Sequence, residues 1–242
     1  MRLAAANCFD VSDVAITNFI AQEKPTVFCI VNPNNPTGRY WPKESILSFV
    51  KGHRETLFLV DEAYIDYLGK QHSLERDVCH HPNLIVVKSM SKAYALSGGR
   101  VAYAVCSPTL REHVDKLIPP WSVSLVGQIA GVEALRDEPY YAEKYAETHA
   151  IRERMNAHLA TCEHWRVFDS CANWILLRLN TLGADQLVET LKRKNIFIRH
   201  CGSMSNYLGN HFVRVAVKDP CTAQRVVTEM ANCAAVLSEA AR

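Results

Sequence analysis

Four polar side chains follow apolar segments of the sequence, close to the points where those segments end. They are Asn35, Asp61, Tyr64 and Lys92, which supply an amide, a carboxylate, a phenol and an amine. The apolar segments are TVFCIV (residues 26–31), LFLV (57–60) and LIVV (84–87). Because open α/β sheets bind ligands at the carboxyl ends of their parallel strands, we expect these four side chains to meet at one edge of a sheet.

The residue types at this edge suit the cofactor pyridoxal phosphate (PLP). A PLP site needs a lysine for the Schiff base, a carboxylate that keeps the pyridine nitrogen protonated, and donors for the ring phenolate and the phosphate. The sequence supplies each of these types near the ends of the apolar segments. The predicted chemistry is therefore that of a PLP site with Lys92 as the Schiff-base residue.

Longer motifs carry a resemblance to a known family. Three of them occur in the order found in fold-type I PLP enzymes, the class I/II aminotransferases: NPNNPTG (32–38), DEAYIDY (61–67) and SMSKAYALSGGRVAY (89–103). The chain most resembles the subgroup of histidinol-phosphate aminotransferase and its threonine-phosphate decarboxylase relatives. Further similarity covers nearly the whole chain, in PPWSVSLVGQ (119–128), SCANWILLRL (170–179) and HFVRVAV (211–217).

The resemblance implies roles for Lys92 and Asp61. Lys92 would form the Schiff base and move the proton between the substrate α-carbon and the cofactor, whereas most lysines that follow a strand are solvated. Asp61 would pair with the pyridinium nitrogen, and its neighbour Glu62 serves as a comparison without that role. The alternative for an acid at a strand end is a helix cap.

The same resemblance implies the remaining contacts to the cofactor. Asn35 and Tyr64 would donate hydrogen bonds to the ring oxygen, with a turn asparagine and a half-buried core tyrosine as the alternatives. Ser89, Ser91 and Arg100 would hold the phosphate, since hydroxyls and a guanidinium suit a dianionic oxygen cluster. Gly98 and Gly99 would permit a close turn before the next strand.

Two arginines in the C-terminal part are candidates for binding the substrate. Arg214 lies within the apolar strand-like segment HFVRVAV, where an unpaired cation is costly unless it faces a cleft. By resemblance it would bind the substrate α-carboxylate, with a structural salt bridge as the alternative. Arg199 would reach a phosphate at the far end of the substrate.

The elements expected to position these residues fall into two parts. From residue 24 to 107, apolar runs alternate with polar connections, which is typical of an α/β fold with a mostly parallel sheet sandwiched by helices. After residue 120 we expect two helices (123–136 and 140–160), then a strand (173–179), a helix (185–194), two strands (196–201 and 211–217) and a C-terminal helix. We therefore predict a PLP-binding large domain at 1–145 and a small α+β domain at 146–242.

Composition excludes several other classes of function. The formal net charge is +2, from 27 basic and 25 acidic residues without a long block of one sign, which argues against nucleic acid or an anionic membrane as a partner. The nine cysteines contain no CxxC pair, so we expect reduced, mostly buried thiols in a cytoplasmic protein. Cys79, His80 and His81 are expected in a surface loop rather than in a metal site.

Family members carry a long section upstream of the point where this sequence begins, with a strand of the large domain, a phosphate-binding loop and an aromatic residue that stacks on the ring. The resemblance therefore implies an incomplete large domain, weaker PLP binding and an apolar surface that a homodimer would cover. Three functions remain open: transfer of an amino group between an amino-acid-like, optionally phosphorylated, substrate and a 2-oxo acid; decarboxylation of a phosphorylated amino acid; or a truncated, non-catalytic protein.

Overall fold

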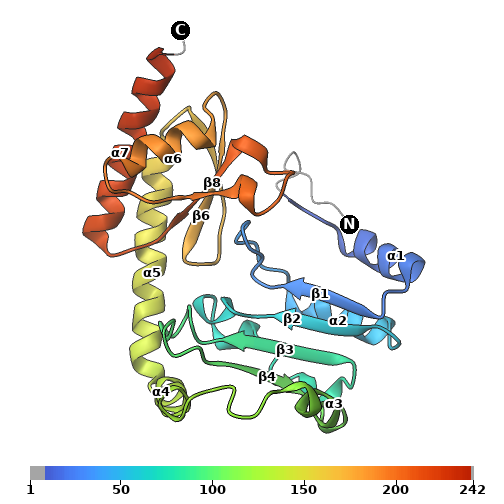
Figure 1. Ribbon diagram of the computed structural model, residues 1–242. Coiled ribbons are helices and arrows are strands. Elements are labelled where there is room, and N and C mark those ends of the chain that lie inside the picture. Colours follow the sequence, from blue (N-terminus) through green and yellow to red (C-terminus); the bar gives the residue numbers. More distant parts are fainter. Residues whose placement is uncertain (1–8, 241–242) are drawn as a thin grey trace. The chain divides into compact units, whose positions relative to one another are not determined.

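In the computed structural model, which describes residues 9–240, four apolar segments form one sheet (Figure 1). Its strands lie side by side in chain order: β1 (Val27–Val31), β2 (Leu57–Asp61), β3 (Leu84–Ser89) and β4 (Ala102–Cys106). The first three are parallel, and β4 runs antiparallel to β3. Val31 lies opposite Asp61, which lies opposite Val87, so the carboxyl ends of the parallel strands meet at one edge. The predicted α/β class with a mostly parallel sheet is confirmed.

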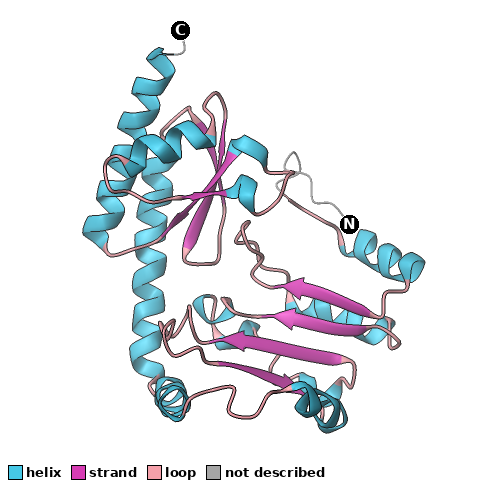
Figure 2. Ribbon diagram, in the orientation of Figure 1, coloured by secondary structure: helices cyan, strands magenta, loops and turns pink. Residues whose placement is uncertain are grey.

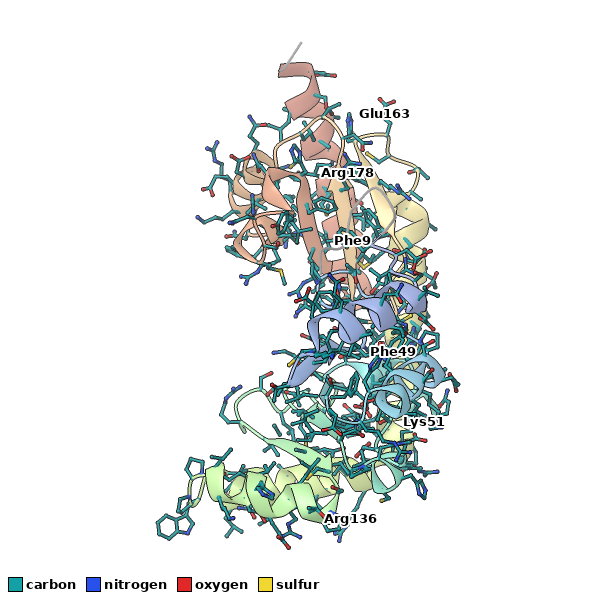
Figure 3. All side chains as sticks on the ribbon, turned by 90° about the vertical axis from the view of Figure 1, so that its right-hand side faces the viewer. Phe9, Phe49, Lys51, Arg136, Glu163 and Arg178 are labelled. Atoms are coloured by element: carbon teal, nitrogen blue, oxygen red, sulfur yellow. The ribbon has the colours of Figure 1, made fainter. Side chains whose placement is uncertain are left out.

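One face of this sheet is covered by α1 (Asp13–Glu23), which the sequence analysis did not predict, and α2 (Lys43–Gly52). The α2 residues Ile46, Phe49 and Val50 have helical spacing and are all buried, whereas Lys51 is exposed; Phe49 and Lys51 are labelled in Figure 3. These helices share a core with the alternate strand residues Ile30, Phe58, Val60, Leu84 and Val86. The burial of this face fixes the register of the strands.

The opposite face of the sheet is less covered within the described residues. On β1, Val27, Cys29 and Val31 are all exposed, while Ile30 between them is buried. Because side chains alternate along a strand, the same face carries Asp61 of β2 and Ser89 of β3. The two predicted site residues at strand ends therefore project away from the helix-covered core.

Two helices follow β4: α3 (Pro108–Val114) and α4 (Leu125–Arg136). Each begins at a serine, Ser107 or Ser124, whose hydroxyl accepts a hydrogen bond from a backbone N–H of the first turn. A Cβ added to Gly131 of α4 would lie 3.2 Å from both the Met90 sulfur and a Val101 methyl. This small residue lets α4 pack closely against the turn that carries Lys92.

The chain divides into two units, of which unit 1 comprises residues 9–35 and 40–142 of the described part, and unit 2 residues 36–39 and 143–240. The helix α5 (Glu138–Leu159) begins in unit 1 and continues into unit 2. Unit 2 holds an antiparallel sheet of order β5-β6-β8-β7 (Figure 2). The strands are β5 (Trp165–Phe168), β6 (Trp174–Leu179), β7 (Arg199–His200) and β8 (Phe212–Ala216).

Helices cover one face of the unit 2 sheet. They are α6 (Ala184–Lys192), α7 (Pro220–Ala240) and the second half of α5, and they pack on Ile175, Leu177, Leu179, Val213 and Val215. The strand β5 was not predicted, and β7 is confined to Arg199 and His200 instead of the expected 196–201. A 3-10 turn at Cys201–Ser203 ends β7 early.

The NPNNPTG motif is shared between the units. Its last residues belong to unit 2, where the Trp174 indole N–H donates to the Pro36 carbonyl (2.8 Å) and Cys171 N–H donates to the Gly38 carbonyl (2.8 Å). Gly38 has a φ of +70°, and a Cβ there would lie 2.1 Å from the Ser170 hydroxyl. The glycine of the motif is therefore required both by its backbone conformation and by close packing.

Between residues 9 and 240, no helix has the length and apolar character needed to cross a membrane. The cysteines in this range are free thiols, but only Cys201 and Cys233 are buried. The expectation of mostly buried thiols is therefore wrong, because Cys29, Cys79 and Cys221 lie on exposed positions of a strand, a turn and a helix. The ninth cysteine, Cys8, lies outside the described residues.

Candidate functional site

The candidate site lies at the carboxyl edge of the unit 1 sheet. Backbone hydrogen bonds extend the parallel pattern just past the strands, from Asn32 N–H to the Asp61 carbonyl (2.8 Å) and from Glu62 N–H to the Val87 carbonyl (2.8 Å). The segments that leave β1, β2 and β3 are therefore held in register where they diverge. All seven predicted cofactor residues lie in these segments of unit 1: Asn35, Asp61, Tyr64, Ser89, Ser91, Lys92 and Arg100.

The loop after β1 carries Asn35, which is half-buried. Its base is fixed by the side chain of Asn32, which is only 1% exposed. The Asn32 amide nitrogen donates to the Trp41 carbonyl (2.9 Å), and its oxygen accepts from Trp41 N–H (2.8 Å). These two hydrogen bonds, which the sequence analysis did not identify, join the two ends of the loop that carries Asn35.

Asp61 is the last residue of β2, and its side chain is half-buried. One carboxylate oxygen accepts a hydrogen bond from Ala63 N–H (2.9 Å), which shapes the turn toward the half-buried Tyr64. Beyond this turn, Tyr67 is buried, and burial raises the pKa of its phenol to about 12. Its hydroxyl donates to the Lys92 carbonyl (3.4 Å), so this loop contacts the Lys92 turn.

The turn after β3 runs from Ser89 to Arg100. Ser91 is buried, Lys92 is exposed, and the Ser97 hydroxyl donates to the Ser91 carbonyl (2.7 Å). The predicted close turn at Gly98 and Gly99 does not use glycine's conformational freedom, because neither residue has a positive φ.

Two non-glycine residues of this turn adopt the left-handed conformation instead: Ala95 (φ 56°) and Arg100 (φ 52°). For such residues this conformation costs about 1–3 kcal/mol and is found mainly at functional sites. The Arg100 guanidinium is exposed and donates to the Ser97 carbonyl (3.3 Å).

A buried ionic cluster lies on the other side of the sheet edge, and sequence reasoning missed it. Lys88 Nζ lies 3.3 Å from Asp66, 3.5 Å from Glu75 and 3.7 Å from Glu62, and its side chain is 3% exposed. Burial raises the pKa of the Glu62 carboxyl, although hydrogen bonds from Ser73 and Leu74 and the charge of Lys88 oppose that shift. The available signal was a lysine directly after the apolar segment LIVV (84–87).

Two tyrosines complete this cluster. The Tyr94 hydroxyl donates to Asp66 (3.3 Å), and Tyr103, the register partner of Lys88, donates to Glu75. Burial and the neighbouring carboxylates raise the pKa of both phenols, so both remain protonated donors. Every carboxylate of the cluster therefore has a cation and at least one hydrogen-bond donor beside it.

The two predicted substrate arginines lie in unit 2. Arg199 of β7 is the register partner of Arg214 of β8, so both side chains leave the same face of the sheet. The Arg214 guanidinium lies over the Trp174 ring, 5.1 Å from its centroid, and is half-buried, whereas Arg199 is exposed. Burial raises the pKa of the nearby Cys201 thiol to about 11, against the charges of both arginines. Two like charges side by side favour an anion on this face.

The chain matches a known enzyme family. Residues 6–230 match the family model described as aminotransferase class I and II. Histidinol-phosphate aminotransferase of Methanocaldococcus jannaschii is 27% identical over 209 residues, which cover 86% of this chain and 55% of that protein. The enzyme of the same name from Aromatoleum aromaticum is 37% identical over 172 residues, which cover 70% and 48%. The chain spans about half the length of the curated relatives it matches.

Solved structures show a likeness of fold. Histidinol-phosphate aminotransferase from Clostridium acetobutylicum aligns with a TM-score of 0.86 at 24% identity, over 93% of this chain and 68% of that one. The enzyme from Sinorhizobium meliloti, solved in complex with pyridoxal-5'-phosphate, aligns with a TM-score of 0.82 at 23% identity, over 93% and 62%. The chain therefore has the fold of the matched part of these two structures, which is 68% of the first and 62% of the second.

Proposed function

Because the chain belongs to the aminotransferase class I and II family, we propose that it carries the PLP-binding catalytic part of an aminotransferase. One observation supports this proposal: three parallel strands of unit 1 end at, or lead into, residues that supply a carboxylate, an amide, a phenol, two serines, a guanidinium and an exposed amine. The reaction would exchange an amino group between an amino-acid-like substrate and a 2-oxo acid.

The chemical types of these side chains suit PLP. When bound, PLP supplies a carbonyl that condenses with amines and a ring that accepts electrons from the substrate. Lys92 is the exposed amine in the set, and Asp61 is half-buried, so both can reach a ligand at this edge. In the proposal, Lys92 would hold the cofactor through its Nζ and would move the proton at the substrate α-carbon. Asp61 holds the proton on the pyridine nitrogen.

The other five residues would orient the cofactor. Asn35 and Tyr64 would donate to its ring oxygen, and the rigid base of the Asn35 loop supports a fixed donor there. Ser89, Ser91 and Arg100 would hold the phosphate. Arg100 has the left-handed backbone conformation. Such conformations of non-glycine residues cluster at ligand-binding sites, which supports a phosphate contact at this turn.

For the substrate, we propose a molecule with two anionic groups. Arg214 would bind the α-carboxylate of an amino-acid-like substrate and Arg199 the phosphate of a phosphorylated one, since both side chains leave the same face of the unit 2 sheet. Decarboxylation of a phosphorylated amino acid is not favoured, because the family match and the curated relatives named above are aminotransferases.

Covalent labelling tests the cofactor proposal. Purified chain is incubated with PLP and reduced with borohydride, and the label is located by peptide mapping. We expect wild type to be labelled at Lys92 and Lys92→Ala to lose that label, while a control variant at another exposed lysine, Lys116→Ala, keeps it. Wild type labelled only at scattered surface lysines would overturn the proposal.

A second assay tests the reaction and its substrate. The chain is mixed with PLP, a 2-oxo acid as the amino acceptor and a panel of amino donors, namely amino acids and histidinol phosphate, and consumption of the 2-oxo acid is followed. We expect turnover that Lys92→Ala abolishes, and Arg199→Ala to raise KM only for the phosphorylated substrate. A chain that is labelled at Lys92 but converts none of the panel would favour the truncated, non-catalytic alternative.

We propose that the chain forms a homodimer. Five apolar side chains between residues 117 and 129 are exposed: Leu117, Trp121, Leu125, Val126 and Ile129. Such a surface on a monomer usually marks an interface, which a second copy would cover. Sedimentation equilibrium should give twice the chain mass, and Leu125→Lys should shift the species toward monomer; a monomeric wild type would exclude the dimer.

A cytoplasmic location remains a proposal as well. The free thiols of the described cysteines support it, because exposed thiols persist in reducing compartments. Fractionation of cells that express the native protein is the direct test, and recovery outside the cytosolic fraction would contradict it.

A further inference from the structure

The buried cluster around Lys88 contacts two of the three segments that carry the candidate site, those after β2 and β3. Its carboxylate Glu62 directly follows Asp61, and its carboxylate Asp66 lies two residues after Tyr64. Tyr94, which donates to Asp66, lies two residues after Lys92. Lys88 itself is in β3, just before the turn. One side chain therefore lies at the junction of the loop after β2 and the turn after β3.

Lys88 points away from the site that it adjoins. Alternation along β3 places Ser89 on the face of Asp61 and Lys88 on the opposite face, where its register partner is Tyr103. Its side chain is 3% exposed, and that of Glu62 is 0% exposed. Lys88 therefore has no route to a ligand at the candidate site, and an effect on that site must act through other residues.

The balance of charge makes Lys88 the central member of the cluster. Three carboxylates surround one ammonium group, with Glu62 and Asp66 also buried. Without Lys88, the three anions would repel one another in a region that water does not reach. The loop after β2 would then have to move to expose Glu62 and Asp66, and Asp61 and Tyr64 lie within that loop.

We propose that Lys88 is a positioning residue, which holds the loop bearing Asp61 and Tyr64 against the turn bearing Lys92 through its contacts with Glu62 and Asp66. This role rests on the proposed function for its effect on PLP, but its effect on the two segments can be measured without the cofactor. A purely structural role, by contrast, would stabilise unit 1 as a whole and favour neither segment.

Amide hydrogen exchange on the cofactor-free chain separates these roles. We expect Lys88→Met to speed exchange roughly tenfold or more in residues 62–68 and 90–96, because loss of a buried charged hydrogen bond shifts local opening by at least that factor. Exchange in β1 and α2 should rise only where it requires global unfolding, so the two segments are compared with these elements over exchange times too short for global unfolding. The matched control is Lys43→Met, which removes a half-exposed ion pair with Asp77 (3.4 Å) elsewhere in unit 1.

The conservative variant and the cofactor give the second readout. Lys88→Arg keeps the charge and should restore slow exchange in both segments. With PLP, Lys88→Met should shift the pH profile of borohydride-trapped label at Lys92 and lower its yield, and Lys88→Arg should restore both. Faster exchange spread evenly over unit 1, or an unshifted pH profile beside local loosening, would overturn the positioning role.

The proposal can still be tested if Lys88→Met does not fold or if PLP does not label wild type. If Lys88→Met does not fold, Tyr94→Phe removes only the link between the turn and Asp66 and should speed exchange in residues 90–96; unchanged exchange there would overturn the proposal. If wild type is not labelled by PLP, the proposed function fails, while the exchange of residues 62–68 and 90–96 still decides whether Lys88 fixes these segments.

Discussion

The two sides of the sheet edge in unit 1 treat charge in opposite ways. On one side, Asp61 is half-buried and Lys92 is exposed, so both remain accessible to a ligand. On the other side, the side chain of Lys88 forms ion pairs with Glu62 and Asp66, and all three side chains are almost completely buried. Adjacent residues of the same strands thus belong to different environments, because side chains alternate across a sheet.

This difference separates the residues that stabilise the fold from the residues that can bind a ligand. Accessible polar groups can be replaced at little cost to the fold, whereas a buried charge that loses its partner is strongly destabilising. Variants on the cluster side should therefore change the free energy of unfolding most, and variants on the site side should change it least. Five variants test this ranking.

The largest loss of stability is expected for Lys88→Met. It leaves three carboxylates without their cation, and breaking a buried ion pair in this way costs about 3–5 kcal/mol. Urea denaturation followed by circular dichroism measures the change. The control Lys43→Met removes a more exposed pair and should cost at most about 1 kcal/mol. Equal losses in the two variants would break the comparison.

Glu62→Gln should change how stability depends on pH. Burial raises the pKa of the Glu62 carboxyl above its ordinary value of 4.5. The stability linked to the protonated carboxyl is therefore fully present below that value, and it is lost as the pH rises through the pKa of the folded state. Glutamine does not titrate. Unfolding measured from about pH 4 to about pH 8 should therefore shift in favour of the variant as pH rises. A constant difference between variant and wild type would contradict burial of an ionisable Glu62.

A smaller loss is expected for Tyr94→Phe, which deletes one hydroxyl and keeps the ring against Tyr141. A hydrogen bond to a charged group contributes about 1.5–3 kcal/mol, and the remaining contact of Asp66 with Lys88 should hold the loss near the lower limit. Urea denaturation provides the value. Tyr140→Phe is the control, since Tyr140 is exposed, and a loss there as large as in Tyr94→Phe would mean that the Asp66 bond adds nothing.

The sequence predicted the strands that carry the site, because uninterrupted apolar segments between polar connections are typical of parallel strands. It also indicated that Asn35, Asp61, Tyr64 and Lys92 lie at or after strand ends. In the structure Asp61 is the last residue of β2, and the other three lie in the segments after β1, β2 and β3. It did not predict β5, whose four residues, Trp165 to Phe168, include an arginine on the exposed side and are too short for a clear pattern.

The cluster was missed for a physical reason. Glu62 was read only in comparison with Asp61, and Lys88 only as the end of an apolar run, because a sequence does not reveal which face of a strand a charge occupies. The carboxylate partners of Lys88 lie 13 to 26 residues away in the sequence, with Glu75 the nearest and Glu62 the farthest. The turn was misread similarly: glycines indicated its conformation, but Ala95 and Arg100 adopt the positive φ values.

On the site side, Asp61→Asn should cost little stability. Asparagine keeps the oxygen that accepts from Ala63 N–H, and the side chain is half-buried, so the loss should stay below about 1 kcal/mol. The yield of PLP label at Lys92 should nevertheless fall, because a neutral amide does not hold the proton on the pyridine nitrogen. Label yield equal to that of wild type would exclude Asp61 from this role.

Lys92→Ala should have the smallest effect on stability of the five. Its side chain is exposed, and the described hydrogen bonds of this residue use its backbone carbonyl, which alanine retains. The free energy of unfolding should therefore stay within about 0.5 kcal/mol of wild type, while labelling at this position is lost completely. The rankings by stability and by labelling then run in opposite directions across one sheet edge. If Lys92→Ala destabilised the chain as much as Lys88→Met, the two sides would form one structural unit, and the accessible side would no longer stand apart as a site.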